Sequence, residues 1–232
     1  MTGDIDQIRE NYDKICLRVR KAAERAGRKP EEIKIVAVSK TVDPERMKKA
    51  FECGITDFGE NRVQELCKKY DIIDVDCNWH LIGHLQTNKV KYIVDKVSLV
   101  HSLDRMGLAV EMQKRAEKAG RVLDALVQVN VSGEETKFGI SPKDTVKFIH
   151  EISKMGNIRI KGLMTIAPEV QNPEDIRWVF AELRKLLIDI KEENIDNIDM
   201  EYLSMGMSND FEVAIEEGAN IIRVGTALFG KR

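Results

Sequence analysis

Short apolar segments alternate with amphipathic helical segments along the sequence, and this alternation restricts the fold more than any other feature. Each apolar segment is a few residues long and is bounded by turn residues, the pattern of a strand buried on both faces of a parallel sheet. We predict eight such strands, at residues 33–40, 55–59, 79–84, 97–102, 122–131, 158–166, 200–204 and 221–224. A helical segment follows each strand, and a further helix at residues 5–26 precedes the first.

Capping residues mark the same boundaries independently of the apolar pattern. Proline follows an N-cap residue, where the first turn of a helix tolerates it, at Asp43-Pro44, Ser141-Pro142 and Asn172-Pro173. Glycine, which readily takes the left-handed conformation that ends a helix, closes four helical segments, at Gly54, Gly120, Gly156 and Gly218.

The alternation predicts an α/β fold, a single (β/α)8 TIM barrel with an extra N-terminal helix. We assign residues 1–232 to this one domain, since the eight units leave no residues for a second one. A doubly wound open sheet is the alternative, because one wrongly assigned strand would prevent closure. No GxGxxG and no GxxxxGK[ST] motif follows a strand, so the usual nucleotide-binding forms of that alternative are not expected.

The charge balance limits the partners of the protein. The formal net charge is −2, so we expect no general attraction to nucleic acid or to a membrane, and an anion must be bound at a local site. The first residues are polar and acidic, and no apolar run approaches the roughly 20 residues that span a bilayer. The four cysteines lack CxxC spacing. We therefore expect a cytoplasmic protein with reduced thiols and no zinc site.

The first predicted strand ends in Lys40, at the carboxyl end, where parallel α/β folds place their chemistry. Taken alone, Lys40 is better explained as the point where the strand meets water. Other polar residues at the same rim also have ordinary explanations, such as Asn61 as a helix cap and Lys137 as a solvated loop charge. The remaining candidates at this rim include His84, Gln86, Asn130, Met164, Ser204 and Ser208.

Two features at the end of the chain point to an anion site. Gly225-Thr226 follows the eighth strand, where backbone N–H groups at a helix start point outward and where barrels of this class recurrently bind phosphate. Arg223 shares a strand face with Ile221, while Ile222 and Val224 take the other face. If the Arg223 face is the barrel interior, its guanidinium is buried there and needs an acceptor or an anion. Opposite Lys40, these groups suggest a phosphate ligand that carries an aldehyde, bound to the lysine as a Schiff base.

Eight stretches of the sequence match one family, in order and over essentially the whole chain. They include the runs HxIGxLQxNK, from His80 to Lys89, and SMGMSxD, from Ser204 to Asp210. The stretches are Ala37–Lys40, Phe58–Glu65, Trp79–Lys89, Val129–Val131, Lys137–Ile140, Lys161–Met164, Leu203–Asp210 and Arg223–Gly230. On these residues the chain resembles the YggS/PROSC group of pyridoxal 5′-phosphate (PLP) homeostasis proteins, or PLP-binding proteins.

The resemblance implies a barrel of the alanine racemase N-terminal type that carries PLP on Lys40. It also implies phosphate contacts from Ser208 and from Gly225 and Thr226, with Arg223 facing the pyridine nitrogen and Asn61 lining the cofactor. Ser204 is a second candidate for the phosphate contact, although the start of a helix favours Ser208. Lys89 and Lys137 are candidates for assisting PLP transfer.

The resemblance and the residues together favour a PLP carrier or regulator of intracellular PLP homeostasis over an enzyme. A cation at the ring nitrogen disfavours the protonated pyridinium that carbanion chemistry needs. Racemases of this fold also take a second acid/base from a β-domain, which we do not expect in a sequence that ends at Arg232.

Two enzyme interpretations stay open beside the carrier. The first is a PLP-dependent, racemase-like enzyme of low activity, and the second is a PLP-free barrel that acts on a sugar phosphate. For the carrier we expect PLP-dependent apo-enzymes as partners, and a monomer.

Overall fold

A computed structural model describes residues 2–230, and these residues form a closed barrel of eight parallel strands. The strands are β1 (Lys34–Val38), β2 (Asp57–Glu60), β3 (Asn78–Leu81), β4 (Leu99–Leu103), β5 (Leu123–Gln128), β6 (Ile158–Met164), β7 (Ile198–Ser204) and β8 (Ile221–Val224). Each strand pairs with its neighbours in the sequence, and β8 closes the barrel on β1 with Val36 opposite Arg223. The predicted (β/α)8 barrel is therefore confirmed, and the open sheet is excluded.

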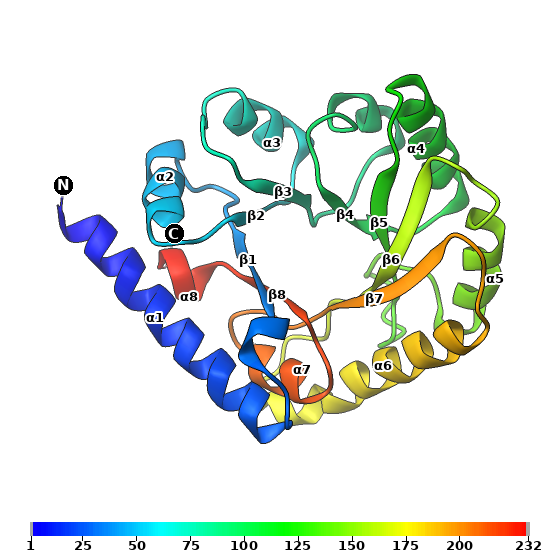
Figure 1. The fold of residues 1–232 in the computed structure, drawn as a ribbon. Coiled ribbons are helices and arrows are strands. Elements are labelled where there is room, and N and C mark those ends of the chain that lie inside the picture. Colours follow the sequence, from blue (N-terminus) through cyan, green and yellow to red (C-terminus); the bar gives the residue numbers. More distant parts are fainter. Residues whose placement is uncertain (1, 231–232) are drawn as a thin grey trace.

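Helices connect the strands on the outside of the barrel (Figure 1). They are α1 (Thr2–Arg25), α2 (Pro44–Glu52), α3 (Val63–Tyr70), α4 (Met106–Lys118), α5 (Pro142–Ile152), α6 (Arg177–Glu192), α7 (Phe211–Glu216) and α8 (Thr226–Phe229), with short 3-10 helices η1 (Pro30–Glu32), η2 (Thr87–Tyr92) and η3 (Pro173–Ile176). The predicted extra N-terminal helix is α1, which packs against α2, α7 and α8. The assignment of residues 1–232 to one domain stays a prediction, and residues 1, 231 and 232 lie outside the described residues.

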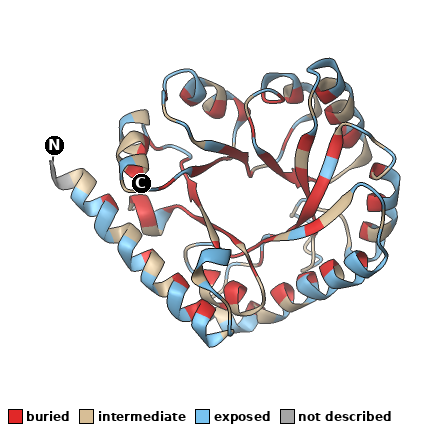
Figure 2. Cartoon of the chain, viewed as in Figure 1, coloured by how far each residue is buried: buried red, intermediate tan, exposed pale blue. Residues whose placement is uncertain are grey.

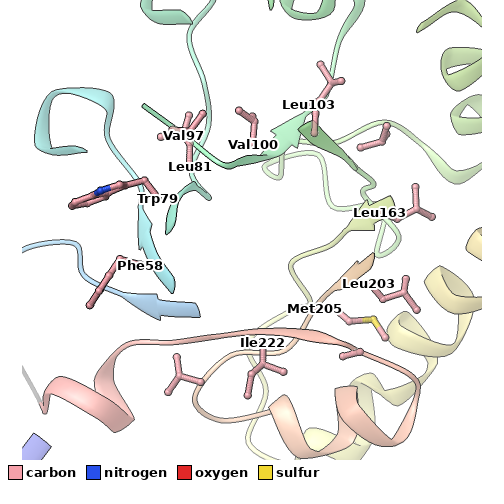
Figure 3. Close-up of a cluster of buried hydrophobic side chains, with 14 of the residues drawn as sticks. Phe58, Trp79, Leu81, Val97, Val100, Leu103, Leu163, Leu203, Met205 and Ile222 are labelled. Atoms are coloured by element: carbon pink, nitrogen blue, oxygen red, sulfur yellow. The ribbon is translucent and has the colours of Figure 1, made fainter. Parts of the chain in front are cut away.

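The main apolar core lies between the strands and the helices. Outward-facing strand residues and inward-facing helix residues form one continuous cluster there, so the barrel is buried while the outer helix faces meet solvent (Figure 2). Figure 3 shows part of this cluster, to which β2, β3 and β8 contribute Phe58, Trp79 and Ile222. The rings of Phe58 and Trp79 lie 6.4 Å apart between centroids.

The interior of the barrel is only partly apolar. Val36, Leu99, Leu126, Met164 and Ile221 form a small separate cluster. Close packing around this interior requires glycine at residue 162, because a Cβ there would lie 2.0 Å from the carbonyl oxygen of Tyr202 and the residue has a φ of +146°. Buried polar side chains, among them His80, His101 and Arg223, fill the rest of the interior. Barrels of this class usually fill their interior with branched apolar side chains.

Strand β1 is shorter than predicted. It ends at Val38, and Lys40 lies in the turn that follows. Val42 N–H donates to the Ser39 carbonyl at 2.9 Å, which closes this turn, and Thr41 adopts a φ of +61°. The apolar pattern could not show this end, because Ser39 remains fully buried beyond the strand.

No helix among residues 2–230 is both long enough and apolar enough to cross a membrane. Over the same residues, His, Cys, Asp and Glu side chains form no group of three or more that could hold a metal ion.

Candidate functional site

A cavity of about 560 Å³ opens at the carboxyl ends of β1, β7 and β8. Its size lies within the range of small-molecule sites, about 300–1,000 Å³. Lys40 lines it from the turn after β1, Ser208 from the loop after β7, and Arg223 from β8 itself. The other lining residues are Val38, Pro168, Glu169, Val170, Pro173, Ile176, Met207, Asn209, Asp210, Gly225 and Thr226.

Lys40 sits in a strained turn that is fixed on both sides. Its side chain is exposed, and its amine makes no hydrogen bond or ion pair with any residue that the structure describes. A β-branched residue rarely takes a positive φ, and Thr41 does so while its N–H donates to Glu65 Oε1. On the other side, Ser39 Oγ donates to Glu60 Oε1 at 2.7 Å. Strain of this kind persists only where the surroundings impose it, and it gathers at functional sites.

A buried ammonium holds these anchors together. Lys69 of α3 donates to the Ser39 carbonyl at 2.6 Å, to Glu60 Oε1 at 2.8 Å and to Glu65 Oε1 at 2.7 Å. Lys69 and Glu60 are both buried, and Glu60 Oε2 has no hydrogen-bond partner. Burial raises the pKa of Glu60, against the hydrogen bonds from Lys69 and Ser39 that favour its charged form. The Lys40 turn thus rests on an ion-pair network behind the cavity.

Arg223 brings a buried positive charge to the cavity. It donates to Ser204 Oγ at 2.7 Å and to the Thr165 carbonyl at 2.9 Å, and none of the ion pairs of the described residues includes it. Burial lowers its pKa to about 10, while the charge of Asp210 acts in the opposite direction. The guanidinium therefore stays charged at neutral pH, with N–H groups left over for a ligand.

The loops after β7 and β8 line the cavity together and are joined by a hydrogen bond. Ala227 N–H, in the first turn of α8, donates to Ser208 Oγ at 3.4 Å. Asp210 Oδ1 accepts from Met207 N–H, which orders the loop that carries Ser208. Burial raises the pKa of Asp210. Ser208, Gly225 and Thr226 thus lie together and offer hydroxyl and backbone donors beside the Arg223 guanidinium.

The structure brings together five of the seven predicted cofactor residues. Lys40, Ser208, Arg223, Gly225 and Thr226 line the same cavity. Asn61 and Ser204 do not. Asn61 lines a neighbouring cavity of about 640 Å³, and Ser204 is fully buried beneath Arg223.

The two further lysines also lie apart from this cavity. Lys89 lines the neighbouring cavity with Asn61, and Lys137 pairs with Glu134 at 2.8 Å in the loop before α5. His84, which also lines the neighbouring cavity, stacks on Phe138 with 3.9 Å between ring centroids.

Sequence reasoning missed the polar groups beneath the cavity. Asp57, His80 and His101 are buried inside the barrel, and hydrogen bonds link them to Ser204. A signal for the histidines was present. In Trp79-His80-Leu81 and Val100-His101-Ser102 a histidine alternates with residues that face the helices, which places it in the interior.

The arrangement fits a phosphorylated aldehyde. The Lys40 amine, which pairs with no described residue, lines the same cavity as the buried Arg223 and the hydroxyl and backbone donors of Ser208, Gly225 and Thr226. A buried guanidinium without a carboxylate partner is costly unless a ligand or a polar network satisfies it. The residues present therefore match what PLP needs.

The comparisons with known proteins identify the family of this chain. A profile of the family described as "Alanine racemase, N-terminal domain" matches residues 4–232. A relative from Aquifex aeolicus, named pyridoxal phosphate homeostasis protein, is 50% identical over 224 residues, 96% of this chain and 97% of its own length. A protein of the same name from Pseudomonas aeruginosa is 40% identical over 226 residues, 97% of this chain and 96% of its own. Among solved structures, PipY of Synechococcus elongatus with PLP bound aligns with a TM-score of 0.81 at 32% identity, covering 92% of this chain and 100% of that chain.

Proposed function

The chain belongs to the pyridoxal phosphate homeostasis proteins of the alanine racemase N-terminal domain family, and we propose that it binds PLP in the Lys40 cavity and acts in PLP homeostasis. The PLP-bound PipY structure, at 32% identity, supports PLP as the ligand. One observation of this structure carries the proposal. The unpaired Lys40 amine, the buried Arg223 and the backbone of Gly225-Thr226 line the same cavity.

Lys40 holds the cofactor covalently in this proposal. The aldehyde of PLP condenses reversibly with a lysine amine to give a Schiff base and one water molecule. The turn fixed by Ser39 and Thr41 keeps the Lys40 amine at the cavity. Because no described residue pairs with this amine, no ion pair has to break before it reacts.

The phosphate is held by Ser208, Thr226 and the backbone of Gly225, which line the same cavity as Lys40. Ser208 and the α8 N-terminus are already joined by the hydrogen bond from Ala227 N–H. Arg223 faces the pyridine nitrogen, with Ser204 as the residue that orients Arg223 from below. Asn61 approaches the cofactor from the neighbouring cavity.

We further propose a carrier rather than an enzyme. A charged Arg223 against the ring nitrogen opposes pyridinium formation, which weakens the electron sink that racemisation needs. The relatives that carry the name homeostasis protein agree with this role. The carrier is a cytoplasmic monomer that delivers PLP to apo-enzymes, and Lys89 and Lys137 are its candidate transfer residues. A low racemase-like activity is the competing function, on the basis of the shared domain family.

The absorption spectrum of the purified protein with added PLP tests the proposal. We expect an imine band for the wild type and for Lys118→Ala, which replaces an exposed lysine of α4 outside the cavity. The band should disappear in Lys40→Ala. A wild-type protein that takes up no PLP would contradict the proposal. Exchange of the α-proton of added amino acids in heavy water separates the two roles, because robust catalytic exchange would favour the enzyme.

A further inference from the structure

A chain of buried hydrogen bonds runs through the barrel interior from Arg223 toward the amino ends of the strands. Arg223 donates to Ser204 Oγ at 2.7 Å, and Ser204 Oγ lies 2.9 Å from His101 Nδ1. His101 Nε2 lies 2.9 Å from His80 Nδ1, and His80 Nε2 lies 2.9 Å from Asp57 Oδ1. These residues come from five strands, and each is at most 8% exposed.

The chain ends near solvent on the opposite face of the barrel. Lys34 donates to Asp57 Oδ1 at 3.0 Å, and 37% of the Lys34 side chain is exposed. Both residues line a cavity of about 340 Å³ at the amino ends of the strands. The hydrogen bonds thus connect the cavity at the carboxyl ends of the strands with the cavity at their amino ends.

The chemistry of the two ends fixes the direction of every hydrogen bond between them. A guanidinium only donates, so Ser204 Oγ must accept from Arg223 and its own hydrogen is free for His101 Nδ1. His101 then carries its proton on Nε2 and donates to His80 Nδ1. His80 in turn carries its proton on Nε2 and donates to Asp57, an ionised carboxylate that only accepts.

The charges agree with this assignment. Burial lowers the pKa of His80 and of His101, so both rings are neutral and each has one donor and one acceptor nitrogen. Burial alone would raise the pKa of Asp57, but the hydrogen bonds from His80 and Lys34 and the charge of Lys34 hold it well below its usual value. The chain therefore has one fixed positive end at Arg223 and one fixed negative end at Asp57.

We propose that Ser204, His101, His80 and Asp57 are positioning residues that hold the Arg223 guanidinium in one orientation, with its remaining N–H groups directed toward the cavity. The site then selects a heteroaromatic ligand whose ring nitrogen is unprotonated and accepts a hydrogen bond. This specificity rests on the proposed function in one respect, that PLP is the ligand whose ring nitrogen meets Arg223. The direction of the chain does not depend on that ligand.

Nitrogen NMR spectra of the histidine rings test the direction of these hydrogen bonds. They are recorded on the whole protein without added ligand. With ¹⁵N-histidine, we expect His80 and His101 both as neutral rings protonated on Nε2. In Ser204→Ala, His101 should lose its single tautomer while His80 keeps it. Ser102→Ala is the matched control, because Ser102 is a buried serine of β4 whose hydroxyl donates to the Gly83 carbonyl, outside the chain. A wild-type His101 protonated on Nδ1 would overturn the proposal, and this measurement needs no variant.

Ligand binding tests the specificity. PLP methylated on its ring nitrogen cannot accept a hydrogen bond, so we expect the wild type to bind it at least about tenfold more weakly than PLP. Ser204→Ala and Asp57→Asn should reduce the ratio of the affinity for PLP to the affinity for the methylated compound. Ser102→Ala should leave this ratio unchanged. Equal affinity of the wild type for both compounds would overturn the specificity. If PLP itself does not bind, the proposed function fails, and the histidine spectra still decide whether the chain has the inferred direction.

Discussion

Replacing Lys69 by methionine should destabilise the barrel and loosen the turn that carries Lys40. Lys69 Nζ makes hydrogen bonds of 2.6, 2.8 and 2.7 Å to the Ser39 carbonyl, Glu60 and Glu65. Removing one partner of a buried ion pair typically costs about 3–5 kcal/mol, because the other charge is left unpaired. Without Lys69 the buried Glu60 carboxylate would lose its ion-pair partner, and its Oε2 already lacks a hydrogen bond.

The loss of stability should depend on pH in a defined direction. Burial raises the pKa of Glu60, and the loss of Lys69 raises it further. Where a native carboxyl binds a proton more tightly than the unfolded one, stability is greatest below the unfolded pKa and falls as pH rises through the native pKa. The difference between wild type and Lys69→Met should therefore be larger at pH 7 than near pH 4.5.

Urea unfolding at the two pH values measures this prediction, with Lys68→Met as the control on the same helix. Lys68 is exposed, so its replacement should change the free energy of unfolding by less than about 0.5 kcal/mol. The double variant Glu60→Gln/Lys69→Met should lose less than the sum of the single losses, because no buried charge is left unpaired. If Lys69→Met lowers the free energy of unfolding at pH 7 by no more than Lys68→Met does, the ion pair does not stabilise the barrel as inferred.

Three further changes test other parts of the account. Ser208→Ala should weaken binding of PLP by about tenfold but leave binding of pyridoxal unchanged, as titration of both compounds would reveal; equal losses would argue against a phosphate contact. Gly162→Ala should cost about 3 kcal/mol or more in urea unfolding, because its Cβ would lie 2.0 Å from the Tyr202 carbonyl oxygen, and a neutral effect would contradict the packing. Burial lowers the pKa of His101, so the unfolded chain binds a proton there that the native one does not, and stability should fall as pH drops below about 6.5. His101→Gln should remove part of that fall in acid unfolding curves, and an unchanged slope would exclude the contribution.

The fold could be predicted because its signals are local and repeated. The start of α2 was marked by Asp43, whose side chain accepts from Arg46 N–H, and by Pro44 at the first helical position. Strand alternation placed Arg223 on the face opposite to Ile222 and Val224, and the structure shows that this face is the barrel interior, since Arg223 is buried while Ile222 belongs to the outer core. Strand ends were less accurate, because Ser39 is buried beyond the end of β1 and looks like a strand residue.

The site could be predicted only where its residues follow strand ends directly. Lys40, Arg223 and Gly225 meet at one rim because parallel strands share it. The hydrogen bonds that hold the rim residues in place could not be predicted. Lys69 and Ser39 are 30 residues apart in the sequence, and His101 and Ser204 are 103 residues apart. Such contacts depend on barrel closure and side-chain conformation, which no local pattern contains.

Trapping the bound cofactor tests the central claim most directly. The protein is incubated with PLP, reduced with borohydride and digested, and the modified peptide is identified by mass spectrometry. The account predicts one stable adduct, on Lys40. An adduct on Lys89 or Lys137 in place of Lys40, or none at saturating PLP, would contradict it.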